Sequence, residues 1–339
     1  MNDIKGMNLP KISVVIPCYT MDRFSDITEL LDSLQAQSYM NIETIVVTER
    51  SPKIAENINN YAHNKNYLNV QVLYNQNEWG ASTSRNLGIR QASGQIIAFI
   101  DDDALPFSTW AEEMAMAYAK DSTIIGLTGP ILPLWEDSSM AWFPKEFYWI
   151  FSCTYWDWAD PTEVRNGYAN NMSFRREAFE LCGYLKTSLG ARGGGESGKH
   201  ELVGEETEFS LRVRYQTHKR IVYHPNIKVK HKVNRYRFTF RFIRKRAYWE
   251  GYTKAAFNKA YRSNKAYRSN NETVLSTEYK LLYRIFSRLM PGLLKLLFRH
   301  PVIALRQLWV TMLVLACVAT GYLTYTMSSL FHRKEGLLK

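Results

Sequence analysis

Short apolar runs alternate with segments of helical periodicity through the first 127 residues. The apolar runs are typical of strands buried on both faces, and the segments between them repeat apolar side chains every three or four residues. Strands are predicted at residues 11–17, 42–47, 70–74, 95–100 and 124–127, and helices at 24–37, 52–64, 80–92 and 110–120. This alternation predicts an α/β fold built on a mainly parallel sheet.

The pattern changes after residue 127. Residues 135–158 hold five of the nine tryptophans. They fit either a lid or second core layer, or a surface that binds an apolar or sugar substrate. A short strand at 170–174 leads into a helix, and the glycine-rich stretch 189–198 predicts a loop without the Gly-Lys-Ser/Thr ending of an ATPase. Residues 204–212 begin a helix with Glu side chains in its first turn, for which the helix dipole is the ordinary explanation.

An apolar segment lies near the C-terminus. No Asp, Glu, Lys or Arg falls between Gln307 and Phe331. At about 1.5 Å per residue such a helix is roughly 37 Å long, enough to cross a bilayer core of about 30 Å. We therefore predict a transmembrane helix at 307–331, with a buried soluble helix as the alternative. Residues 276–306 predict an amphipathic interfacial segment kinked by Pro291, and 332–339 form a basic tail.

Charge divides the chain into two parts. The net charge is +11, but residues 1–227 hold 20 Lys and Arg against 28 Asp and Glu, whereas residues 228–339 hold 23 against 4. We predict a domain at 1–235 and a basic, aromatic-rich connector at 236–275, which holds a short duplication. Such a segment suits single-stranded nucleic acid or anionic lipids. Because it leads into the apolar segment, we expect a membrane with anionic lipids and no nucleic acid.

The basic residues immediately before the apolar segment predict the side of the membrane on which the first domain lies. Lysine and arginine next to a span favour the cytoplasmic side. We therefore predict a single-pass protein of the cell membrane with its first domain on the cytoplasmic face.

Candidate chemistry gathers at the ends of the predicted strands. Three consecutive carboxylates, Asp101 to Asp103, end the strand at 95–100, and Tyr19 and Glu49 follow two other strands. Ligands of parallel sheets bind outside the carboxyl ends of the strands. Asp101 and Asp103 point the same way on an extended backbone and could bind Mn²⁺ or Mg²⁺ together with a phosphate. The alternative is a solvated turn.

Four segments in order resemble the inverting family 2 glycosyltransferases of the GT-A fold. Residues 12–19 resemble the opening strand of that family, and residues 84–103, which include Ser84-Arg85-Asn86 and the three aspartates, resemble its most recognisable segment. Residues 167–179 resemble the acceptor-side segment, and 204–208 the catalytic acid box. The resemblance implies a GT-A domain, which is Rossmann-like, and a metal-dependent transfer from a nucleotide diphosphate sugar.

The resemblance also implies roles for individual residues. Glu206 would be the catalytic base, and Glu49 would contact the base of the nucleotide; each stands where the family usually has Asp. A UDP-sugar, such as UDP-glucuronate, is the expected donor. The resemblance further implies metal binding by Asp103 and His231, nucleotide-sugar binding by Pro17, Tyr19, Glu49, Arg85, Asp101 and Asp102, and acceptor binding by Asn171, Glu205 and Trp249.

Residues in the C-terminal part of the chain indicate which kind of acceptor to expect. The Gln-x-x-Arg-Trp motif of processive members is absent after Gln216, so we expect transfer of one sugar. Residues 229–255 resemble archaeal glucosyl-dolichyl phosphate glucuronosyltransferases, which implies a saccharide linked to dolichyl or polyprenyl phosphate as acceptor. Transfer to a surface polysaccharide or to polyprenyl phosphate itself are alternatives. A membrane-tethered protein that binds polyanions is the non-enzymatic alternative.

Overall fold

The computed structural model describes residues 8–76, 78–190, 204–263 and 274–331. The glycine-rich stretch after residue 190, the second copy of the duplication and the basic tail lie outside the described residues. The chain forms two compact units: unit 1 holds Met1–Leu132 and Trp156–His231, and unit 2 holds Pro133–Tyr155 and Lys232–Lys339. The aromatic stretch 133–155 therefore groups with the C-terminal helices and not with the rest of the predicted domain at 1–235.

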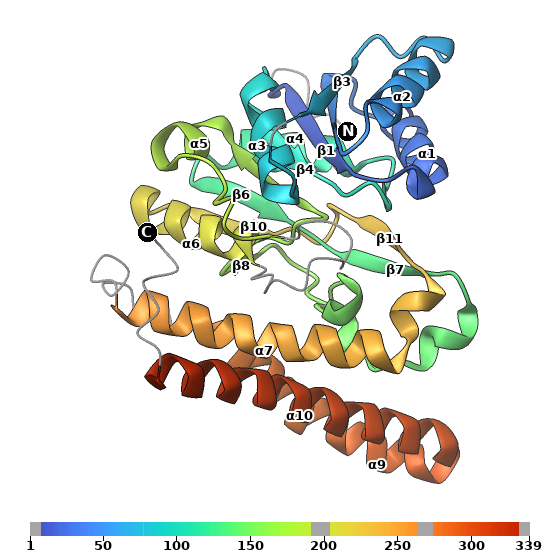
Figure 1. The fold of residues 1–339 in the computed structure, drawn as a ribbon, viewed down its shortest axis with the longest axis vertical. Helices are drawn as coiled ribbons and strands as arrows, with labels where there is room; N and C mark the ends of the chain where they lie inside the picture. The colour runs from blue at the N-terminus through green and yellow to red at the C-terminus, as the bar shows by residue number, and fades with distance from the viewer. Residues whose placement is uncertain (1–7, 77, 191–203, 264–273, 332–339) are drawn as a thin grey trace. The chain divides into compact units, whose positions relative to one another are not determined.

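An eight-stranded sheet forms the centre of unit 1 (Figure 1). Its strand order is β3-β2-β1-β4-β9-β6-β10-β8. Strands β3, β2, β1 and β4 are parallel, as the alternating pattern predicts, whereas β9 is antiparallel to both β4 and β6. These strands are β1 (Ile12–Cys18), β2 (Ile42–Glu49), β3 (Val70–Asn75), β4 (Ile96–Phe99), β6 (Ile124–Thr128), β8 (Thr162–Val164), β9 (Met172–Arg175) and β10 (Arg220–Tyr223).

A second, three-stranded sheet has the order β5-β11-β7. Its strands are β5 (Ala104–Pro106), β7 (Ile131–Trp135) and β11 (Val229–Val233). Strand β5 begins directly after the three aspartates and pairs antiparallel with β11. This small sheet therefore fixes the position of the acidic turn.

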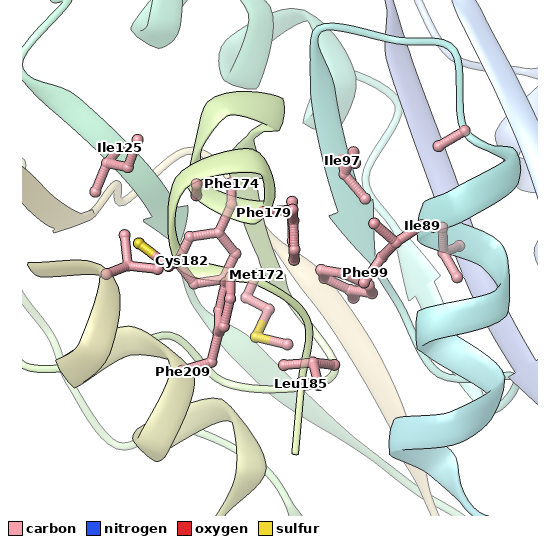
Figure 2. Close-up of a cluster of buried hydrophobic side chains, with 14 of the residues drawn as sticks. Ile89, Ile97, Phe99, Ile125, Met172, Phe174, Phe179, Cys182, Leu185 and Phe209 are labelled. Carbon is pink, nitrogen blue, oxygen red and sulfur yellow. The ribbon is translucent and has the colours of Figure 1, made fainter. Parts of the chain in front are cut away.

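Helices of unit 1 follow the predicted spacing closely. They are a 3₁₀ turn η1 (Met21–Arg23), α1 (Phe24–Gln35), α2 (Pro52–Asn64), α3 (Ala81–Gln91), α4 (Trp110–Lys120), α5 (Arg176–Cys182) and α6 (Glu205–Thr217). Residues of α3, α5 and α6 share one buried apolar cluster with the sheet (Figure 2). The rings of Phe179 and Phe209 stack at 4.8 Å within it. This packing holds α6, and hence its acidic first turn, against the sheet.

Unit 2 consists of helices and the aromatic stretch. Its elements are η2 (Ser138–Trp142), η3 (Lys145–Phe151), η4 (Arg235–Phe238), α7 (Phe240–Ser263), α8 (Ser276–Arg284), a π-helical turn η6 (Ile285–Leu289), α9 (Met290–Arg299) and α10 (Pro301–Phe331). The π turn lies just before Pro291, whose missing N–H disturbs the regular helical hydrogen bonds. The rings of Trp135, Phe143 and Phe151 pack around Phe238, so this part of the aromatic stretch forms a core.

Candidate active site

The carboxyl ends of β1, β2 and β4 bring the predicted site residues of unit 1 to one edge of the sheet. Strands β2 and β4 both pair with β1. Tyr19 follows β1, Glu49 ends β2, and Asp101 to Asp103 follow β4. Pro17 lies within β1, opposite Val47, where it shapes the strand end. The parallel order of neighbouring strands thus explains why residues far apart in sequence meet here.

Asp103 and His231 are neighbours. Strand pairing sets His231 opposite Ala104, the residue after Asp103. His231 Nε2 lies 3.2 Å from Asp103 Oδ1, and both side chains are buried. The small sheet therefore brings together the two residues for which metal binding is predicted.

Arg23 supplies a cation to the same place and is a residue that the sequence analysis missed. Its Nη1 lies 2.6 Å from Asp102 Oδ1 and 3.1 Å from Asp103 Oδ2. Burial raises the pKa of Asp102 well above its usual range, although the charge of Arg23 opposes this shift. A basic residue following a strand that ends at the ligand-binding edge is the signal that points to Arg23 in the sequence.

The donor atoms at Asp103 suit a divalent ion that shares its ligands with a phosphate. Among the residues that the structure describes, no three His, Cys, Asp or Glu side chains form a metal-binding group. Two protein ligands suffice for ions that also bind substrate phosphates, as Mg²⁺ does. Asp103 and His231 offer one oxygen and one nitrogen ligand, and Asp102 Oδ2 is buried with no hydrogen-bond partner in the described part of the chain. These residues therefore fit Mn²⁺ or Mg²⁺.

Arg85 links the acidic turn to α6. Its guanidinium is buried, and it lies 2.8 Å from both Asp101 Oδ1 and Glu205 Oε1. Burial disfavours the charged form, but the charges of Asp101, Glu205 and Glu206 raise the pKa of Arg85 above its usual value. Among the described residues the buried Arg85 Nε has no hydrogen-bond partner, so its N–H could donate to a ligand. Glu205 thereby has a structural partner in addition to its predicted contact with the acceptor.

The acids in the first turn of α6 differ in their surroundings. Glu208 is fully buried and forms an ion pair with Arg212 at 2.8 Å. Glu205 is buried beside Arg85, whereas Glu206 is half-buried. Glu206 is therefore the carboxylate of this turn that a substrate hydroxyl could reach.

Aromatic and basic side chains surround Tyr19. The guanidinium carbons of Arg23 and Arg50 lie 5.6 and 5.4 Å from the centre of the Tyr19 ring, within the range of cation–π attraction. Arg50 also lies 5.6 Å from the ring of Trp79, which is 53% exposed. Arg50 and Trp79 were not anticipated from the sequence. Cations and flat rings at a strand end provide partners for phosphate and for a nucleobase.

Two residues that were predicted to contact substrates, Glu49 and Asn171, form hydrogen bonds within the fold. Glu49 Oε2 accepts hydrogen bonds from Gly80 N at 2.7 Å and Ser84 Oγ at 3.1 Å, so it stabilises the start of α3. Asn171 is fully buried, accepts from Trp110 Nε1 and donates to the carbonyl oxygens of Pro130 and Ile227. All the hydrogen-bonding groups of the Asn171 amide are thus used within the fold, and we assign it a structural role in place of acceptor binding.

Trp249 belongs to unit 2, on α7, whereas the other predicted site residues belong to unit 1. Its ring packs against the rings of Tyr248 and Tyr252 at 5.4 and 5.1 Å. We therefore treat it as a residue of unit 2.

Comparisons with known proteins agree with this arrangement. The family model of glycosyl transferase family 2 matches residues 13–182. A glucosyl-dolichyl phosphate glucuronosyltransferase of Haloferax volcanii is 30% identical over 253 residues, which cover 74% of this chain and 78% of the relative. Glycosyltransferase AglE of the same organism is 33% identical over 106 residues, 31% of this chain and 34% of the relative.

Solved structures show the same fold at lower identity. The mannosyltransferase PcManGT from Pyrobaculum calidifontis, solved with GDP-Man and Mn²⁺, has a TM-score of 0.57 and 18% identity, covering 93% of this chain and 87% of that one. GalNAc-T7, solved with UDP, GalNAc and Mn²⁺, has a TM-score of 0.53 and 16% identity, covering 84% of this chain and 57% of that one. The chain has the GT-A fold, and it is a glycosyltransferase that belongs to family 2.

Proposed function

We propose that this glycosyltransferase transfers one sugar from a nucleotide diphosphate sugar to a lipid-linked acceptor, with the help of Mn²⁺ or Mg²⁺. The observation that carries the proposal is the pairing of Asp103 with His231 at 3.2 Å, beside the ion pairs of Arg85 with Asp101 and Glu205. The two Mn²⁺-bound neighbours of this fold support a metal at such a site.

Asp103 and His231 would hold the ion. When bound, it supplies positive charge that makes the nucleotide diphosphate a better leaving group. Asp101 and Arg85 would bind the nucleotide, and Arg85 Nε, which has no partner among the described residues, would be a further donor. Tyr19 and Trp79 would contact its base. UDP is the favoured nucleotide, because the curated relative at 30% identity is named a glucuronosyltransferase.

Glu206 would act as the base. The acceptor hydroxyl must lose its proton as its oxygen attacks the anomeric carbon from the face opposite the leaving group, which inverts the configuration there. Glu206 is half-buried at the N-terminus of α6, and a carboxylate placed within hydrogen-bond reach can take this proton. Neighbouring Glu205 is buried beside Arg85, whereas Glu206 is the more exposed of the two, which favours Glu206 for this role.

The acceptor would be a saccharide on dolichyl or polyprenyl phosphate. The name of the Haloferax volcanii relative supports it, and so does the long apolar helix of unit 2. Among the described residues one helix, Pro301–Leu330, is long and apolar enough to cross a membrane. The basic residues near this helix suit the anionic cytoplasmic leaflet, so we place the catalytic unit on the cytoplasmic side.

Calorimetric titration of the full-length protein with UDP tests the proposed site directly. We expect binding in the presence of Mn²⁺ and a loss of at least tenfold in affinity for Asp103→Asn. Asp121→Asn, at a half-buried carboxylate between α4 and β6, is the matched control and should bind as the unchanged protein does. Failure of UDP and GDP to bind at millimolar Mn²⁺ would overturn the proposed site.

A further inference from the structure

Helix α10 exposes one apolar face along its whole length. Its buried positions, such as Ala304, Val314 and Gly321, lie on the opposite side. Most of the exposed large apolar side chains recur every three or four residues or at a multiple of that spacing, as a single face of a helix requires. Those on this face are Val302, Leu305, Trp309, Met312, Leu323, Met327 and Leu330, whereas Ile303 and Leu308 are exposed outside that spacing.

Helix α7 covers the opposite face of α10 and runs beside it (Figure 1). Two glycines let the backbones touch: a Cβ on Gly251 would lie 1.9 Å from Val318 O, and a Cβ on Gly321 would lie 2.0 Å from Tyr248 O. The paired helices stay in contact toward both ends of α10. Further contacts join Phe240 to Trp309, Asn258 to Tyr322, and Lys259 to Ser329.

The covering helix is highly charged. Helix α7 contains seven Lys and Arg and one Glu. Gly251 of α7 lies beside Val318, near the middle of the apolar stretch of α10, so it marks the point on α7 that would lie near the bilayer centre if α10 crossed the membrane. At about 1.5 Å per residue along α7, Lys254 lies roughly 5 Å and Arg244 and Lys245 roughly 10 Å from Gly251. Arg244 and Lys245 are exposed.

These positions argue against a perpendicular span. A helix that crossed the bilayer at residues 307–331 would carry α7 beside it through the hydrocarbon core, whose half-thickness is about 15 Å. Arg244, Lys245 and Lys254 would then lie within that core, where charged side chains are strongly disfavoured. A helix that lies along the bilayer surface needs no such burial, because its covered face can point toward water.

Helix α9 extends the apolar surface and supplies basic residues. It contacts α10 (Figure 1) and exposes Leu294, Leu297 and Phe298, the last at 89%. Lys295 and Arg299 are exposed on the same short helix. Apolar side chains interleaved with cations match the boundary between acyl chains and anionic headgroups.

We propose that α9 and α10 form an in-plane anchor that lies in one leaflet of an anionic bilayer and does not cross it. The exposed apolar face of α10 enters the boundary between headgroups and acyl chains, and α7 lies on the aqueous side of α10. The inference rests on the proposed membrane attachment, and it requires neither the donor nor the acceptor proposed above.

A depth profile tests the anchor. In the full-length protein with Cys317→Ala, single cysteines replace Val302, Met312, Leu323 or Leu330 and carry a nitroxide label on phosphatidylcholine–phosphatidylglycerol vesicles. We expect a similar, shallow immersion depth at all four positions. Deep labels at Met312 and Leu323 with shallow labels at Val302 and Leu330 would overturn the proposal and indicate a span. A label at Lys259, exposed on α7, is the control and should remain accessible to water.

Sidedness gives a second, independent readout. A cysteine appended after Lys339 and another at Leu68, which is 99% exposed in unit 1, are labelled in sealed vesicles with a maleimide that cannot cross the bilayer. For the in-plane anchor both cysteines react to the same extent before detergent is added. A helix that spans the bilayer would put the two cysteines on opposite sides of it, so the fraction labelled at one would be the fraction protected at the other. That result would contradict the in-plane anchor. Loss of vesicle binding would overturn both the anchor and the membrane attachment, whereas UDP binding reports on the catalytic site alone.

Discussion

At the scale of residues, charge compensation organises the candidate active site. Asp102 and Asp103 share the Arg23 guanidinium, at 2.6 and 3.1 Å. Arg85 joins Asp101 and Glu205, each at 2.8 Å. Buried carboxylates need such partners, because an uncompensated charge in the interior is costly. The same carboxylates that would bind a metal therefore have a protein cation beside them.

Replacing Arg23 should increase the effect of metal on stability. Arg23→Gln removes the cation beside Asp102 and Asp103, which should cost on the order of 3 kcal/mol of unfolding free energy without metal. Mn²⁺ should restore more stability to this variant than to the unchanged protein, because the ion supplies the missing charge. Thermal unfolding with and without Mn²⁺ measures the difference, and Arg90→Gln, a surface arginine of α3, is the control. Equal metal-induced shifts in both proteins would contradict this role of Arg23.

Two neighbouring glutamates should respond differently to loss of charge. Glu206→Gln should lower the rate of sugar transfer by about 10²–10⁴, the usual contribution of a general base. Glu205→Gln removes a buried partner of Arg85 and should chiefly lower the midpoint of thermal unfolding. Paired measurements of transfer rate and thermal unfolding separate the two. Undiminished transfer by Glu206→Gln would show that the acceptor is already ionised, as a phosphate is.

Part of this site could be predicted from the sequence. The carboxylates after β4 and the acids of α6 belong to recognisable motifs, and the expected neighbours Asp103 and His231 are indeed adjacent. The position of Arg23 after a strand end was a usable signal, but the partners of Arg23 and Arg50 could not be assigned, because they are set by the packing of strand ends. For Asn171 the motif indicated a contact with substrate, whereas burial and hydrogen bonds within the fold occupy its side chain.

At the scale of elements, strand ends opposite the site are held by a polar cluster around Glu43. This residue of β2 lies opposite Ser13 of β1 and accepts hydrogen bonds from Lys11 Nζ at 2.8 Å and Ser93 Oγ at 2.7 Å. Burial alone would raise the pKa of Glu43, but the hydrogen bonds from Lys11, Ser13 and Ser93 lower it to about 2. The cluster thus joins β1, β2 and the turn before β4.

Stability should follow the protonation of Glu43. Because its pKa is lower in the folded state than its ordinary value of 4.5, its contribution is complete above pH 4.5 and is lost as the pH falls toward 2. Glu43→Gln should reduce the free energy of unfolding by about 1 kcal/mol at pH 7, a modest value because the side chain is partly exposed. Chemical unfolding at several pH values checks this. An equal loss at pH 2.5 and pH 7 would contradict the assignment.

The crossing of α7 and α10 should be sensitive to one methyl group. Gly321→Ala places a Cβ against Tyr248 O and should cost about 1–3 kcal/mol, because neither backbone can move aside without losing contacts. Gly292→Ala, in α9, meets nothing within 4 Å and should be neutral or slightly stabilising through helix propensity. Thermal unfolding of the full chain in detergent compares the matched pair. Equal midpoints would show that the two helices do not pack closely.

Elements with strong periodicity were predictable, and the others were not. The helices Pro52–Asn64 and Trp110–Lys120 have the predicted bounds. Strands β5 and β11 escaped prediction because segments of three to five residues carry too little alternation, and their pairing depends on residues more than 100 positions apart. The apolar segment was predictable as a helix, but it begins at Pro301, and its packing against a charged helix cannot be read from hydropathy.

At the scale of the whole molecule, the part of the chain that holds most of the acids and the more basic part that follows it have different proposed roles. Nearly all the acidic residues precede residue 228, as do the candidate site residues of unit 1 other than His231, and just over half of the basic residues lie from residue 228 onward. The acidic side chains of unit 1 would hold a metal and its nucleotide, while the basic and apolar residues of unit 2 would hold a membrane. A lipid-linked acceptor is a substrate for which both properties are needed.

Product analysis tests the central claim of sugar transfer most directly. The full-length protein is incubated with Mn²⁺, a panel of UDP- and GDP-sugars, and polyprenyl-linked saccharides in vesicles, and the lipids are examined by mass spectrometry. We predict one new lipid-linked product, heavier by a single sugar residue, that disappears without the divalent ion and in Asp103→Asn. No consumption of any nucleotide sugar, or a product formed equally well by Asp103→Asn, would contradict the account.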